Sequence, residues 1–382
     1  MNEIALSNRP QAPRGEPLYG ERRDIRAVSY ALCSAVFGVL VMRIVSYFAA
    51  LPSDTYGQTL LGDMLFSLPV QLVFFLIVPF CIYKFYGKRS VRAVLEYGSV
   101  GAFKPYFLLA LPLGLFVYFL TLGVSSAWQA LLGATGYSHA SAATPLPDGF
   151  VAGFFVAEIV MTAVLPAVCE EFVMRGGLLT TARKSLGIVG CVVLGGVAFG
   201  LFHQNVRQVF YTSLFGALAV FLTYKTKSLY PAMLMHFVNN FCGVFFEYAE
   251  HYGWPVFGGL WSMINELSAE YPWLLFIVFA AVAGAALGIV VIMLYCREKR
   301  VIRDKTAVIK DSAFDATNKR VVIMGEFDPA RIESLEMQRE VYGKDYREQK
   351  YKPTLRDLAL IAALATVTVV TTVFTYVWGF FY

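Results

Sequence analysis

The chain has 382 residues, of which 57% are hydrophobic and 15% are charged, and its mean hydropathy is +0.58. Soluble domains are about 45–50% apolar and about 25% charged, so this chain has too few polar residues to cover soluble cores of its size. The composition excludes a water-soluble enzyme, a disordered chain and a secreted disulfide scaffold. It predicts an integral membrane protein of the all-α class, built as a polytopic bundle of transmembrane helices.

Apolar stretches long enough to cross about 30 Å of hydrocarbon as helices occur nine times along the chain. They cover residues 28–52, 64–85, 106–126, 150–181, 186–204, 207–224, 229–247, 273–296 and 358–381. We therefore expect about nine spans, with a small cytoplasmic insertion before the last one.

The basic residues alternate between successive connections. Lys and Arg occur in segment 1–27 and in the connections after the second, fourth, sixth and eighth spans, whereas 53–63, 127–149 and 248–272 contain none. Cytoplasmic loops of membrane proteins are enriched in Lys and Arg. The pattern predicts a cytoplasmic amino terminus and a carboxyl terminus outside. It also assigns the net charge of +5 to membrane orientation, so no nucleic-acid partner is expected.

This topology divides the chain into six parts. They are a cytoplasmic segment (1–27), the amino-terminal spans (28–149), a core of four spans (150–247), an outer loop with span eight (248–296), the cytoplasmic insertion (297–357) and the last span (358–382). Within the insertion we expect a short strand at Arg320–Met324 and a helix at Pro329–Tyr342.

Polar and ionisable residues concentrate in the core of four spans. They are Glu170, Glu171 and Arg175 in span four, His203 at the end of span five, and His236, Asn239 and Asn240 in span seven. An ionisable group within a bilayer costs several kcal/mol unless a partner offsets it, so each is a candidate for function.

Helical spacing suggests which of these groups pair. Glu171 and Arg175 are four residues apart and share one helix face, which is the favourable order for a structural ion pair. Glu170 points about 100° away and has no basic partner in its span. His236 and Asn240 are also four residues apart, so they face the same place.

These groups suit hydrolysis in two ways that the residues leave open. In the first, Glu170 and His203 remove a proton from water that attacks a peptide carbonyl, while His236 and Asn240 donate hydrogen bonds to the oxyanion. In the second, Glu170, His203 and His236 form a zinc site of two histidines and one carboxylate, whose open position holds the water. The cofactor is accordingly either a divalent metal such as zinc or none.

Three motifs follow one another on the spans of this core. They are EExxxR at Glu170–Arg175, FxxxH at Phe199–His203 and HxxxN at His236–Asn240. In that order they closely resemble the CPBP family of intramembrane proteases, also described as CAAX prenyl protease 2 or Rce1-like and abortive-infection proteins. The resemblance covers roughly 150–247, which it identifies as a CPBP-like catalytic core.

The resemblance implies a role for each motif residue. Glu170 would be the catalytic carboxylate, with His203 beside it, and His236 and Asn240 would complete the site. The family is labelled a metalloprotease, although a glutamate-activated water without metal is also argued for it. The implied substrate is a membrane-associated peptide or protein, lipidated in the prenyl-CAAX branch, and the implied location is a bacterial plasma membrane.

Two other classes of function use the same residues. A proton-coupled transporter would employ the Glu/His cluster as a relay, and a non-proteolytic scaffold or immunity protein would act through partners. Outside the motifs, Arg43 and Glu158 are isolated charges, with each other as one candidate pairing. Gly196/Gly200 and Gly284/Gly288 have the GxxxG spacing that permits close helix approach.

Overall fold

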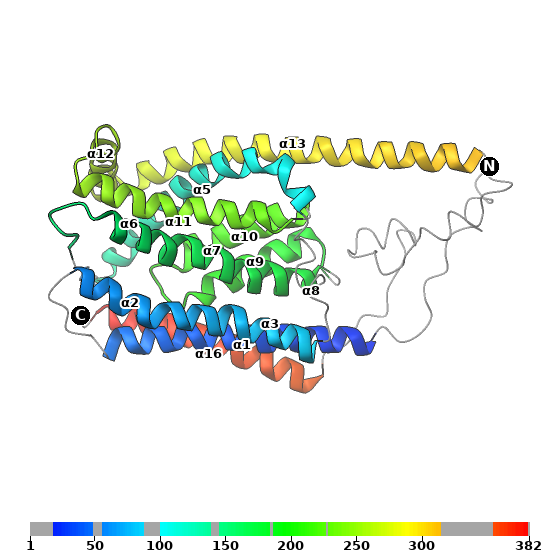
Figure 1. Cartoon of the computed structure of the whole chain (residues 1–382), viewed down its shortest axis with the longest axis horizontal. Coiled ribbons are helices and arrows are strands. Elements are labelled where there is room, and N and C mark those ends of the chain that lie inside the picture. The colour runs from blue at the N-terminus through cyan, green and yellow to red at the C-terminus, as the bar shows by residue number, and fades with distance from the viewer. Residues whose placement is uncertain are drawn as a thin grey trace.

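The computed structural model describes residues 18–48, 56–87, 100–138, 145–183, 186–226, 228–314 and 354–380. These residues form helices and the turns between them, with no strand in this part of the chain (Figure 1). The elements are α1 (Leu18–Phe48), α2 (Tyr56–Val70), the π-helical η1 (Gln71–Ile77), α3 (Val78–Cys81), the π-helical η2 (Ile82–Tyr86), α5 (Val100–Ala134), α6 (Ala152–Glu158), the π-helical η3 (Ile159–Val164), α7 (Leu165–Glu171), the π-helical η4 (Phe172–Leu179), α8 (Thr180–Ala182), α9 (Ile188–Phe202), α10 (Val209–Thr226), α11 (Tyr230–His251), α12 (Phe257–Glu270), α13 (Pro272–Phe314) and α16 (Leu355–Trp378).

Each of the nine predicted spans overlaps a helix. Among the described residues, seven helices are long and apolar enough to cross a membrane. The fourth of them is the rod from α6 to α8. The other two predicted spans are α9, which has only 15 residues, and α11, whose hydropathy is lowered by the polar residues in its middle. The predicted polytopic bundle is therefore confirmed.

The helices lie side by side along the long axis of the molecule (Figure 1). The rod from α6 to α8 lies in the middle with α9, α10 and α11, between α5 and α13 on one side and α1, α2, α3 and α16 on the other. The outermost helices expose large apolar side chains, such as Ile277 and Ile289 of α13 and Val370 of α16. Faces of this kind are covered by lipid in a membrane, so the chain is an integral membrane protein.

The two GxxxG spacings have different environments. A Cβ added to Gly196 would lie 2.9 Å from the Ser213 carbonyl oxygen, and one added to Gly200 would lie 2.6 Å from that of Val209. Both glycines thus let α9 approach α10 at backbone contact, as the spacing predicts. Gly284 and Gly288 of α13 have no atom of the described structure within 4 Å of such a Cβ. Their spacing marks no helix contact within this part of the chain.

The stretch of α13 that could cross a membrane runs from Pro272 to Cys296, close to the predicted eighth span. The helix itself continues to Phe314 without a break, so it extends beyond this span into the predicted insertion. The strand expected at Arg320–Met324 and the helix expected at Pro329–Tyr342 lie outside the described residues.

Candidate active site

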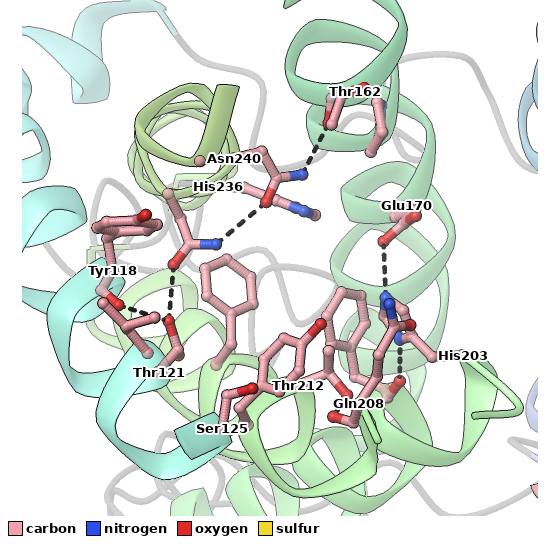
Figure 2. Close-up of a pocket in the computed structure, with 17 residues that line it drawn as sticks. Tyr118, Thr121, Ser125, Thr162, Glu170, His203, Gln208, Thr212, His236 and Asn240 are labelled. Carbon is pink, nitrogen blue, oxygen red and sulfur yellow. Dashed lines mark hydrogen bonds and ion pairs between the residues drawn. The ribbon is translucent and has the colours of Figure 1, made fainter. Parts of the chain in front are cut away.

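The four side chains predicted to be catalytic line one cavity of about 400 Å³. Glu170 comes from α7, His203 from the end of α9, and His236 and Asn240 from α11. Figure 2 shows Glu170 pointing toward His203 on one side of the cavity, with His236 and Asn240 on the side of α11. Three separate spans therefore bring the predicted acid, imidazoles and amide to one place.

Glu170 and His203 form a loose pair. The Glu170 Oε2 atom lies 3.9 Å from His203 Nε2, and the two side chains are 12% and 20% exposed. The same Oε2 atom is buried and has no hydrogen-bond partner among the described residues. His203 Nδ1 lies 2.8 Å from the Phe199 carbonyl oxygen. A carbonyl only accepts, so Nδ1 carries the proton, and Nε2 of the neutral ring presents its lone pair to Glu170.

Glu171 lies in a closely paired network on the same helical rod. Its Oε1 atom accepts from Arg175 Nη1 at 2.9 Å and from His236 Nδ1 at 2.9 Å. The side chains of Glu171 and Arg175 are fully buried. Arg175 also donates to the Gly216 carbonyl oxygen at 3.1 Å, and its guanidinium carbon lies 4.7 Å from the centre of the Phe199 ring.

The predicted Glu171–Arg175 ion pair is thus present. Glu171 has in addition a second task that the sequence analysis missed, because it holds the ring of His236. A contact between two helices leaves no spacing signal within either of them.

Asn240 is oriented by a chain of hydrogen bonds. Its Nδ2 atom donates to the Thr162 carbonyl oxygen at 3.0 Å, and its Oδ1 atom accepts from Asn239 at 3.1 Å. Asn239 in turn accepts from the Thr121 hydroxyl at 3.2 Å. Asn239 therefore takes part in the site, and so does α5 through Thr121.

Residues 152–242 match a protein family described as type II CAAX prenyl endopeptidase Rce1-like. This segment is thus similar to the Rce1-like family. It contains Glu170, His203, His236 and Asn240, and it confirms the resemblance read from the three motifs. No curated protein and no solved structure matches the chain.

The cavity wall also includes residues that belong to none of the three motifs, and some of these lie outside the Rce1-like segment. Polar members that the sequence analysis did not single out are Tyr118, Thr121 and Ser125 of α5, Gln208 in the turn after α9, and Tyr211 and Thr212 of α10. Such residue types are ordinary in membrane helices, so nothing in the sequence distinguishes them. The cavity wall thus combines polar side chains with apolar ones such as Phe199 and Phe215.

The expected pairing of Arg43 with Glu158 is wrong. Glu158 accepts hydrogen bonds from the hydroxyls of Tyr56 and Tyr248, the latter at 3.0 Å. Arg43 donates instead to the carbonyl oxygen of His203 at 3.1 Å. Both charges are satisfied inside the bundle, but by partners that only the helix packing brings near.

The predicted zinc ligands do not fit a metal site as they are arranged. Among the described residues, no three His, Cys, Asp or Glu side chains are positioned to hold a metal ion. The predicted zinc site needs His236 beside Glu170, but the His236 Nδ1 atom contacts Glu171 instead.

Proposed function

We propose that the protein is an intramembrane endopeptidase that hydrolyses a peptide bond of a membrane-associated protein or peptide. The observation that carries this proposal is the 3.9 Å pair of Glu170 and His203, two residues of the Rce1-like segment, at the wall of a cavity. The family description supplies the reaction class. The cavity supplies room for a peptide carbonyl beside two proton acceptors.

The pair is suited to activating a water molecule. Glu170 Oε2 and the lone pair of His203 Nε2 are both acceptors, so they do not hydrogen-bond to each other directly. A water with two hydrogen bonds of about 2.8 Å spans two acceptors about 4 Å apart, donating one hydrogen to each. Attack of that water on a peptide carbonyl would transfer one of its protons to Glu170 or His203, which would then protonate the leaving amine.

Asn240 is better placed than His236 to donate a hydrogen bond to the oxyanion. Its amide has two N–H groups, and only one is engaged by the Thr162 carbonyl. The second can stabilise the negative charge that develops on the carbonyl oxygen.

His236 would donate from Nε2 only as an imidazolium, because its Nδ1 proton faces Glu171. Arg175 already neutralises that carboxylate. The His236 ring, held by Glu171, forms part of the cavity wall.

The substrate class follows from the location of the site. The cavity lies among membrane-spanning helices, so the scissile bond belongs to a peptide that inserts into or lies against the bilayer. A lipidated peptide of the CAAX type is the candidate that the family description suggests. The alternation of basic connections supports a cytoplasmic amino terminus and a carboxyl terminus outside. A bacterial plasma membrane is the location that the family resemblance implies.

The decisive experiment compares membrane proteomes of cells that carry the wild-type protein, Glu170→Ala or Glu158→Gln. Glu158 is a matched control because it lies on the same rod but bonds to two tyrosines away from the cavity. We expect an uncleaved precursor to accumulate with Glu170→Ala alone. The purified protein in vesicles should then cleave that precursor, and a chelator arm tests metal dependence.

Other outcomes would identify the competing functions. Absence of any cleavage, combined with proton-coupled flux that Glu170→Ala abolishes, would indicate a transporter. Full biological activity of both Glu170→Ala and His203→Ala would indicate a scaffold or immunity protein. Either result would overturn the endopeptidase proposal.

A further inference from the structure

The turn that carries His203 follows a short helix. α9 has 15 residues and is therefore about 22 Å long, which is shorter than the roughly 30 Å of a hydrocarbon core. The turn from His203 to Gln208 connects this helix to α10. Non-helical backbone packed among membrane-spanning helices is stable only where the protein itself provides hydrogen-bond partners.

Side chains of other helices provide these partners. Val206 donates its N–H to the Thr375 hydroxyl of α16 at 2.9 Å, and its carbonyl accepts from the Trp128 indole of α5 at 2.7 Å. Gln204 donates from its side chain to the Val36 carbonyl of α1 at 2.9 Å. The turn is thus attached to three helices that lie outside the Rce1-like segment.

The first residue of the turn is attached in the same way. Arg43 of α1 donates to the His203 carbonyl at 3.1 Å, while the His203 ring is held by the Phe199 carbonyl. The next residue, Gln204, is fully buried and has a φ of 49°, a left-handed conformation that costs a non-glycine residue about 1 kcal/mol. Such a conformation persists only where its surroundings impose it.

We propose that Arg43 is a positioning residue that holds His203 at its distance from Glu170. Two attachments near His203 lead to α1: Arg43 donates to the His203 carbonyl, and the neighbouring Gln204 donates to the Val36 carbonyl. A change at Arg43 would therefore move the imidazole rather than remove a group from the reaction. The inference depends on the proposed function only for the statement that this displacement slows hydrolysis.

The test compares Arg43→Met with Arg43→Lys and Arg207→Met. Arg207 is the matched control because it lies in the same turn but donates to the Gln129 side chain, at 3.0 Å, and not to backbone. We expect Arg43→Met to lower kcat about 10- to 100-fold with little change in KM, since small displacements of a reacting group cost this much. Arg43→Lys should restore part of the loss, and Arg207→Met should match the wild type.

A second readout does not require activity. Carbethoxylation of His203 by diethyl pyrocarbonate, measured by mass spectrometry relative to His251, reports how the ring is held. We expect Arg43→Met to change this rate at least threefold, and Arg207→Met to leave it unchanged. If the wild-type protein cleaves nothing, the endopeptidase proposal fails while this measurement still tests the positioning.

Thr375→Val provides a further variant should Arg43→Met not fold. It removes the acceptor of the Val206 N–H and keeps the side-chain volume, and we expect it to change the His203 labelling in the same direction. Wild-type labelling and a wild-type kcat in either folded variant would overturn the proposal. A loss that appears in KM alone would also overturn it.

Discussion

Two adjacent carboxylates of one helical rod have contrasting surroundings, and only Glu170 lines the cavity. Glu171 is fully buried and accepts from both Arg175 and His236 at 2.9 Å. Glu170 has a partner only at 3.9 Å and a buried oxygen without a hydrogen bond in the described structure. A buried charge with its partners supports the arrangement of the helices. One that lacks them is available for chemistry.

The largest expected effect separates the two carboxylates by activity. Glu170→Gln should lower the cleavage rate by about 10²–10⁴-fold, the contribution of a general base, because an amide cannot take the proton from water. The melting temperature in detergent should stay close to that of the wild type. Glu158→Gln controls for the loss of a buried carboxylate elsewhere on the rod. A Glu170→Gln protein with normal cleavage would contradict the distinction.

The second effect separates them by stability. Arg175→Met leaves the Glu171 charge buried without its ion partner, which should destabilise the protein by about 3–5 kcal/mol. Denaturant unfolding in mixed micelles measures this loss. The double variant Glu171→Gln/Arg175→Met removes the isolated charge and should recover part of it. Equal stability of Arg175→Met and the wild type would show that the network does not support the fold.

A smaller effect tests whether the α11 side of the cavity contributes to the transition state. Asn240→Ala should lower kcat by about 10²–10³-fold, as the loss of an oxyanion donor does. Asn239→Ala should cost less, because Asn239 acts by orienting Asn240. Steady-state kinetics on the same substrate distinguishes the two. Equal losses for both would assign Asn240 a role in packing instead.

The smallest effect concerns the helix that carries His203 toward Glu170. Gly200→Ala places a methyl group 2.6 Å from the Val209 carbonyl oxygen and should cost about 1–3 kcal/mol through overpacking. Gly284→Ala meets no atom of the described chain and should change stability by less than about 1 kcal/mol, since alanine favours a helix. Thermal unfolding of the two variants checks this. A larger loss at Gly284 would mean that α13 packs against a partner.

The sequence by itself determined the membrane bundle, the Glu171–Arg175 pair and the four candidate side chains. Composition decides between water and lipid, and helical periodicity places residues four apart on one face. Only the tertiary structure decided that Glu171 also holds His236, that Arg43 contacts the His203 carbonyl and not Glu158, and that Gly196 but not Gly284 lies at a helix contact. These contacts join residues far apart in the chain. They depend on how whole helices pack, which no local spacing encodes.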